Sequence, residues 1–96
     1  MEVVIITGMS GAGRSTAAHV LEDSNWYVVD NLPPAMLLPL IKEVEGEHQK
    51  VAVVIDVRSR AFFEELAQSL SALKQMQINV RILFTYANRF QSVYCN

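Results

Sequence analysis

The sequence predicts an α/β fold in which a parallel sheet of about four strands is flanked by helices. Short apolar runs alternate with segments whose apolar residues recur at helical spacing. Strands that alternate with helices are joined by right-handed crossovers, which place the strands parallel in one sheet. The third run, residues 51–55, is apolar throughout, as expected for a strand that is covered on both faces.

The first strand and helix surround a glycine-rich segment. A strand over residues 3–7 precedes a helix over about residues 14–23. Three apolar residues are expected on the inner face of this helix: Ala17, Val20 and Leu21. Asn25 follows the helix and suits the left-handed conformation in which many helices end.

The second strand, residues 26–29, ends at a proline-rich corner over residues 30–34. A helix over about residues 35–44 follows, and Pro39 is tolerable there only in the first turn. Its expected inner face comprises Leu37, Leu38, Leu40 and Ile41.

The second half predicts a strand over residues 51–55, a helix over about residues 60–76 and a strand over residues 80–84. Ser59 is placed to cap the helix. A stripe at helical spacing is expected in the core: Phe62, Phe63, Leu66, Leu70 and Leu73. We divide the chain into a domain over residues 1–84 and an atypical tail over residues 85–96.

The glycine-rich segment fits the pattern Gly-x-x-x-x-Gly-Lys-Ser/Thr at every fixed position but one, because Arg14 stands where the lysine belongs. Such a Walker A loop presents successive backbone N–H groups to an anion, and the following helix adds its free first-turn donors. The P-loop candidates are Gly8, Met9, Ser10, Gly11, Ala12, Gly13, Arg14 and Ser15. The alternative is a glycine-rich turn without a ligand.

Two side chains in the loop have expected chemical roles. The Ser15 hydroxyl is placed to coordinate Mg²⁺. Arg14 keeps the positive charge of the usual lysine, but its longer planar fork is not a conservative replacement. We therefore expect phosphate binding to survive in altered form, and hydrolysis to be the less secure property.

Two further polar corners fall at strand carboxyl ends, so all three should meet at one edge of the sheet. Asp56 could hold Mg²⁺, or it could serve only as a turn or capping residue. Arg58 and Arg60 could reach phosphate or lie solvated at the surface. Asp30 and Asn31 could position a second substrate or a water, or only stabilise their turn.

Four segments together resemble one bacterial P-loop family, the RapZ-type nucleotide-binding proteins that include the RNase adapter protein. The segments are Gly8 to Ser15, Leu21-Glu22-Asp23, Val29 to Pro34 and Val54 to Arg60. The resemblance covers residues 3–84. It implies ATP binding by Gly8 to Ser15, and GTP binding by Asp56, Val57, Arg58 and Ser59.

The resemblance also implies a regulatory protein that hydrolyses nucleotides weakly at most. Members of that family are much longer, and RNA binding is assigned to a carboxyl-terminal domain that this chain lacks. We therefore do not expect RNA binding here. A fragment, an early stop or a frameshift near Thr85 would each explain the tail.

Composition limits the remaining function classes. The net charge is −2, unlike the basic surface of a dedicated nucleic-acid binder. Cys95 is the sole cysteine, so a reducing cytoplasm is the natural setting. No secretion signal is visible, and no apolar run reaches the roughly 18 residues of a membrane span. Oligomeric state cannot be read from the sequence.

Three functions remain open. The first is a regulatory domain that binds ATP or GTP with Mg²⁺. The second is an enzyme, either an NTPase or a small-molecule kinase in which Asp30 binds the substrate. The third is a truncated, inactive fragment that aggregates or dimerises through an exposed sheet edge.

Overall fold

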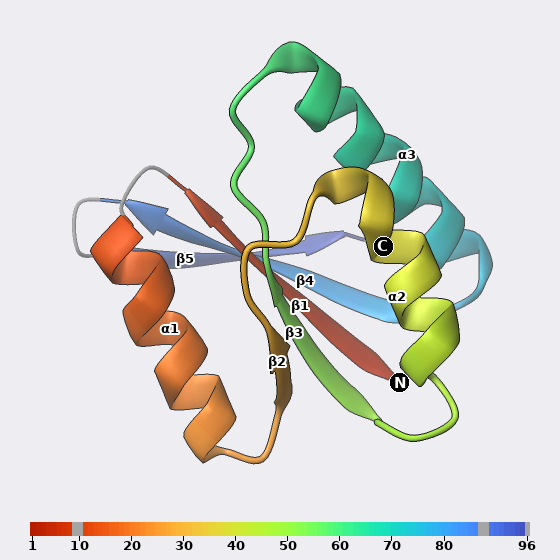
Figure 1. Ribbon diagram of the computed structural model, residues 1–96, viewed down its shortest axis with the longest axis horizontal. Helices are drawn as coiled ribbons and strands as arrows, with labels where there is room; N and C mark the ends of the chain where they lie inside the picture. The colour runs from red at the N-terminus through yellow and green to blue at the C-terminus, as the bar shows by residue number, and fades with distance from the viewer. Residues whose placement is uncertain (9–10, 87–88, 96) are drawn as a thin grey trace.

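The computed structural model describes residues 1–8, 11–86 and 89–95. It confirms the predicted α/β fold, a parallel sheet flanked by helices (Figure 1). In chain order the elements are β1 (Glu2–Gly8), α1 (Gly11–Asp23), β2 (Tyr27–Val29), the 3-10 helix η1 (Pro34–Met36), α2 (Leu37–Val44), β3 (Lys50–Val54), α3 (Arg60–Gln75), β4 (Asn79–Tyr86) and β5 (Arg89–Cys95).

The sheet has the strand order β2-β3-β1-β4-β5. Strand β1 pairs in parallel with both β3 and β4, so Ile5 lies opposite Val53 on one side and Ile82 on the other. Strand β2 pairs in parallel with β3. Strand β5, which was not predicted, runs antiparallel along β4 from Val80 opposite Cys95 to Tyr86 opposite Arg89.

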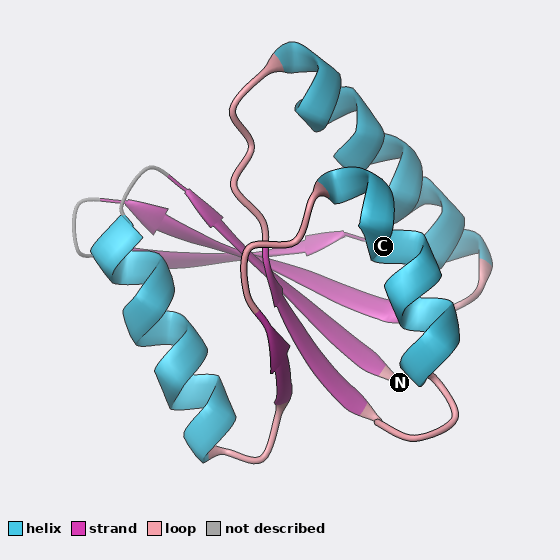
Figure 2. Cartoon of the chain, in the orientation of Figure 1, coloured by secondary structure: helices cyan, strands magenta, loops and turns pink. Residues whose placement is uncertain are grey.

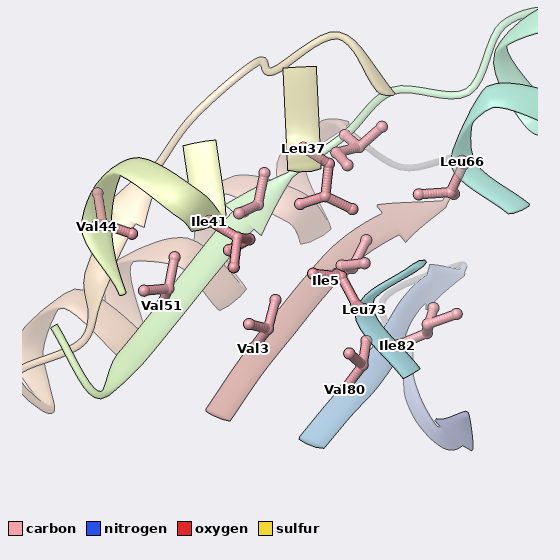
Figure 3. Close-up of a cluster of buried hydrophobic side chains, with 12 residues drawn as sticks. Val3, Ile5, Leu37, Ile41, Val44, Val51, Leu66, Leu73, Val80 and Ile82 are labelled. Carbon is pink, nitrogen blue, oxygen red and sulfur yellow. The ribbon is translucent and has the colours of Figure 1, made fainter. Parts of the chain in front are cut away.

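Helices cover the two faces of the sheet unequally. Helix α1 lies on one face, and α2 and α3 lie on the other (Figure 2). The larger core fills the α2 and α3 side, as Figure 3 shows, and comprises Val3, Ile5, Leu37, Ile41, Val44, Val51, Val53, Ile55, Leu66, Leu73, Val80 and Ile82. Within the described ranges, no helix combines the length and apolarity needed to cross a membrane.

The smaller core lies beneath α1 and comprises Val4, Ile6, Ala17, Ala52 and Val54. Two predicted core residues are wrong, because Val20 is 59% exposed and Phe63 is 62% exposed. A helix that packs on one face of a sheet buries only a stripe of its surface. Helix α1 buries Ala17 in this contact, and α3 buries Leu66 and Leu73. Val20 and Phe63 lie outside the buried stripes.

Helices α1 and α3 end in the same way. Asn25 has φ 68°, which confirms the predicted left-handed stop, and Gln77 has φ 61°. After α1, the N–H of Trp26 donates to the carbonyl of Leu21 at 3.0 Å; after α3, Ile78 donates to Leu73 at 3.2 Å. These are Schellman motifs, in which one left-handed residue turns the chain from a helix directly toward the next strand.

The proline-rich corner divides the helix that was predicted over residues 35–44. Residues 34–36 form η1, and the regular α-helix begins at Leu37. Pro39 lacks the N–H that an α-helix beginning earlier would need, so it lies within the first turn of α2. The hydroxyl of Ser69, on α3, donates to the carbonyl of Pro34 at 3.3 Å and fixes this corner against the longer helix.

Candidate functional site

The predicted P-loop leads from the central strand into α1. Gly8 ends β1 with φ 136°, a conformation that other residues rarely adopt. Helix α1 begins at Gly11, earlier than the predicted start near Arg14, so Gly13 lies buried within its first turn. Met9 and Ser10 lie outside the described residues. The described part has the strand-to-helix form that a phosphate-binding loop requires.

Arg14 and Ser15 line the same pocket, and they bring a cation and a hydroxyl to it. The Arg14 guanidinium donates through Nη1 to the carbonyl of Gly8, so the cation lies against the backbone at the start of the loop. Ser15 is exposed. The hydroxyl of Thr16 donates to the carbonyl of Ala12 at 3.0 Å, within α1 itself. Among the described residues of this turn, Ser15 thus has an exposed hydroxyl for which no hydrogen bond within α1 is found, in contrast to Thr16.

The structure confirms that the three polar corners meet. An open pocket of about 500 Å³ is lined by side chains from all of them: Arg14, Ser15, Asp30, Asn31, Val54, Asp56 and Arg58. Strands β1, β2 and β3 are parallel neighbours, so their carboxyl ends lie at one edge of the sheet. The pocket is polar and holds two cationic and two acidic side chains.

Asp56 lies just beyond β3. The N–H of Ile55 donates to the carbonyl of Ile6 at 2.9 Å, which keeps the chain beside β1 up to this point. Arg58 donates through Nε to the Oδ2 of Asp56 at 2.8 Å. That hydrogen bond is the largest influence on the Asp56 carboxyl, and it lowers the pKa. Partial burial raises the pKa, whereas the charges of Arg14 and Arg58 lower it further, so the net shift is downward. Asp56 is thus ionised at neutral pH and available as an oxygen ligand.

The residues around Asp56 differ in role. Arg58 is 71% exposed and lines the pocket, whereas Asp56 is 29% exposed. Val57 packs against the larger core. The hydroxyl of Ser59 accepts from the N–H of Phe62 at 3.1 Å, which confirms its predicted place as the cap of α3. Of the four residues Asp56 to Ser59, the structure brings Asp56 and Arg58 to the pocket.

The second corner has a distinctive backbone. Asn31 has φ 56°, a left-handed value that asparagine tolerates better than most residues. The N–H of the following residue, Leu32, donates to the carbonyl of Val54 at 2.9 Å, so the corner is pinned to β3. This turn therefore brings Asp30 and Asn31 to the pocket. Stabilising the turn and positioning a second substrate or a water do not exclude each other for these residues.

Sequence reasoning missed a smaller neighbouring pocket. It has a volume of about 180 Å³ and is lined by Asn31, Leu32, Pro33, Asp56, Arg58 and Phe62. Phe62 was expected in the core stripe of α3, but it is half-buried and faces this pocket. Its position in the first turn after the Asp56 corner is the signal that could have found it.

Comparison with known proteins finds matches over most of this chain. The family model described as the RapZ-like N-terminal domain matches residues 1–94. A protein of Thermobifida fusca named "Nucleotide-binding protein" is 48% identical over 101 residues, covering 96% of this chain and 34% of the relative. A nucleotide-binding protein of Cutibacterium acnes is 54% identical over 87 residues, covering 90% of this chain and 30% of the relative. The chain thus spans about a third of the length of these relatives.

Proposed function

The chain belongs to the RapZ-like N-terminal domain family, and on that premise we propose that it binds a nucleotide, ATP or GTP with Mg²⁺, in the 500 Å³ pocket. The observation behind the proposal is that Arg14, Ser15 and Asp56 line one pocket at the carboxyl ends of parallel strands. Several relatives are named nucleotide-binding proteins, which supports the same ligand class.

The phosphates would bind at the amino end of α1. Gly8 removes the side chain that would obstruct the approach to the loop, and the first-turn N–H groups of α1 supply donors. Arg14 adds positive charge, and its guanidinium can donate two parallel hydrogen bonds to phosphate oxygens. Because its guanidinium already donates to the carbonyl of Gly8, it is held within the loop before any ligand arrives.

Mg²⁺ fits the oxygen atoms that line this pocket. The hydroxyl of Ser15 and the ionised carboxylate of Asp56 are both there, and magnesium prefers such oxygen ligands. The described residues contain no group of three or more His, Cys, Asp or Glu side chains that could hold a metal by themselves. The ion would therefore take its remaining ligands from phosphate oxygens and water, as magnesium commonly does.

Titration with a fluorescent ATP or GTP analogue, with and without Mg²⁺, tests the proposal. We expect saturable, Mg²⁺-dependent binding that Ser15→Ala weakens by about tenfold, the effect of losing roughly 1.4 kcal/mol. Ser71→Ala is the matched control, because Ser71 is an exposed serine on α3 that does not line the pocket. Absence of Mg²⁺-dependent binding at millimolar nucleotide would contradict the proposal.

A phosphoryl-transfer enzyme is the second candidate, because Asp30 lines the same pocket and could bind an acceptor. Phosphate-release kinetics separate it from a binding domain that hydrolyses weakly at most. If the loop takes part in turnover, Arg14→Ala will lower the rate. A rate that Arg14→Ala leaves unchanged would show that the loop has no part in any hydrolysis observed.

A further inference from the structure

A separate pocket lies at the opposite edge of the sheet, where the parallel strands begin. This amino-edge pocket has a volume of about 180 Å³, and its lining includes Glu2, Val4, Trp26, Asn79 and Arg81. It shares no residue with the two pockets at the carboxyl ends of the strands. Strand β1 runs from Glu2 to Gly8, so the P-loop lies about 20 Å away (Figure 1). The proposed nucleotide contacts therefore leave this pocket unused.

The pairing of β1 with β4 sets the polar side chains of this pocket on one face of the sheet. Glu2 lies opposite Asn79, and Val4 lies opposite Arg81. Paired residues of neighbouring strands, and residues two positions apart along a strand, project to the same face. Val4 belongs to the smaller core, so all four side chains lie on the face that carries α1. A carboxylate, a guanidinium and an amide are thus grouped around one apolar side chain.

Trp26 supplies an aromatic wall that is fixed by its surroundings. Its N–H donates to the carbonyl of Leu21 at 3.0 Å, at the left-handed stop of α1. Its side chain is half-buried against the smaller core. The Nζ of Lys50 lies 5.9 Å from the centroid of the indole ring, a cation–π contact. The indole is therefore positioned by the fold itself.

The two charged side chains of the pocket can each bind a group of opposite charge. Among the described residues, Glu2 forms no ion pair. Arg81 is exposed, and its guanidinium carries five N–H donors, so a contact elsewhere still leaves donors for a carboxylate. The pocket therefore offers an anion on β1 and a cation on the neighbouring strand β4.

These features favour a small zwitterion that also carries an apolar group. A volume of about 180 Å³ is below the roughly 300 Å³ at which pockets for drug-sized ligands begin. An ammonium group would pair with Glu2, and a carboxylate would pair with Arg81. An apolar side chain would lie against Val4 and Trp26. Free α-amino acids with apolar side chains combine these three parts in one small molecule.

We propose that the amino-edge pocket binds a free α-amino acid with an apolar side chain. Glu2 holds the ammonium group, Arg81 holds the carboxylate, and Trp26 covers the side chain. This site does not depend on the proposed nucleotide-binding function, because the two share no residue. The chain would then bind a second class of ligand at the edge of the sheet opposite to the P-loop.

Trp26 is the sole tryptophan, so the intrinsic fluorescence of the full chain reports on this wall directly. L-leucine and L-phenylalanine are the probes, and at least one should change the emission saturably. Its amide lacks the carboxylate, and its N-acetyl derivative lacks the ammonium group. Each derivative should bind about tenfold or more weakly, because one charge-assisted contact is lost. Titrations at about pH 6 keep the amine of the amide charged, since an α-amino group titrates at about 8.

Two variants assign each contact to its side chain. Arg81→Gln should remove the difference in affinity between the amino acid and its amide, because the carboxylate then has no cationic partner. Glu2→Gln should likewise remove the difference between the amino acid and its N-acetyl derivative. Arg60→Gln and Glu64→Gln are the matched controls, since both residues are exposed on α3 and neither lines the pocket. Thermal melts establish that each variant is folded.

Three results would overturn this inference. The first is the absence of a saturable change with either amino acid at millimolar concentration. The second is equal affinity for the amino acid and its two derivatives, which would mean that the charges are not read. The third is unchanged discrimination in both Arg81→Gln and Glu2→Gln, which would place the binding elsewhere on the chain. None of these results bears on nucleotide binding at the opposite edge of the sheet.

Discussion

At the scale of single residues, the backbone conformation at Gly8 favours glycine over residues that carry a side chain. Its φ of 136° lies where an L-residue is strained. Gly8→Ala should lower the free energy of unfolding by roughly 1–3 kcal/mol, the range typical of such backbone strain. Chemical denaturation measures the difference.

Gly46 provides the control for that substitution. A Cβ added at Gly46 meets nothing within 4 Å, and no left-handed φ is found there. Gly46→Ala should leave stability unchanged or raise it by about 0.4–1 kcal/mol, because alanine restricts the unfolded chain. Equal losses at both positions would contradict the assigned role of Gly8.

The Asp56–Arg58 pair makes a prediction about pH. Arg58 hydrogen-bonds the carboxylate and lowers its pKa, so Arg58→Gln should raise the pKa of Asp56 toward its ordinary value. Because the folded pKa is the lower one, the pair stabilises the protein above the unfolded value of about 3.9, and this contribution is lost as the pH falls through the folded pKa. A carboxyl ¹³C NMR titration measures the shift.

Arg60→Gln is the control for that titration. It removes an equal charge from a neighbouring exposed residue that does not line the pocket. Its effect on the pKa of Asp56 should be smaller than that of Arg58→Gln. Equal shifts from the two variants would mean that general charge, rather than the 2.8 Å contact, lowers the pKa.

At the scale of elements, one substitution after the end of α3 and one inside it should change the free energy of unfolding in opposite directions. Gln77 adopts φ 61° at the Schellman stop, where glycine is the preferred residue. Gln77→Gly should raise the free energy of unfolding by about 1 kcal/mol, by relieving the left-handed strain. Gln68→Gly, at an exposed position inside the same helix, should lower it by about 1 kcal/mol. Urea denaturation of the two variants tests whether the stop governs this helix end.

The strands and helices were predictable because each has a local cause. The apolar runs predicted β1, β3 and β4. Ser59 predicted where α3 begins, and Asn25 predicted where α1 ends. Which apolar residues face the core was less predictable. Val20 and Phe63 satisfy helical spacing, but the angle at which each helix meets the sheet decides which of them is covered.

The site was predictable to a similar degree. Motif spacing predicted Arg14 and Ser15, and the place of Asp56 and Arg58 after a strand predicted those two. All four line one pocket, as the parallel topology led us to expect. The smaller pocket was not predictable, because it depends on where the Leu32 corner is pinned and on how Phe62 emerges from α3. Long-range contacts of that kind leave no periodic pattern in a sequence.

At the scale of the whole molecule, β1 lies between β3 and β4 and contributes to both cores. Ile5 is fully buried among residues of β3, β4 and the helices above them. Ile5→Ala should cost about 2–5 kcal/mol. That is a large part of the roughly 5–15 kcal/mol that stabilises a typical domain. Val20→Ala, at an exposed position, should stay within about 0.5 kcal/mol of the unsubstituted protein in the same denaturation experiment.

The antiparallel strand β5 could not be predicted from the pattern of apolar runs. An alternation of strands and helices predicts parallel pairing, whereas β5 follows β4 without an intervening helix and turns back along it. With β5 in place, β4 is an interior strand, and β2 and β5 form the two edges of the sheet.

The hydrogen bond from Arg14 to the carbonyl of Gly8 ties the cation to the end of β1. It uses one of the five N–H groups of the guanidinium, so the groups that remain can donate to a phosphate oxygen without displacing the carbonyl. Under the proposed function, the positive charge is preorganised, and less side-chain entropy is lost when the anion binds.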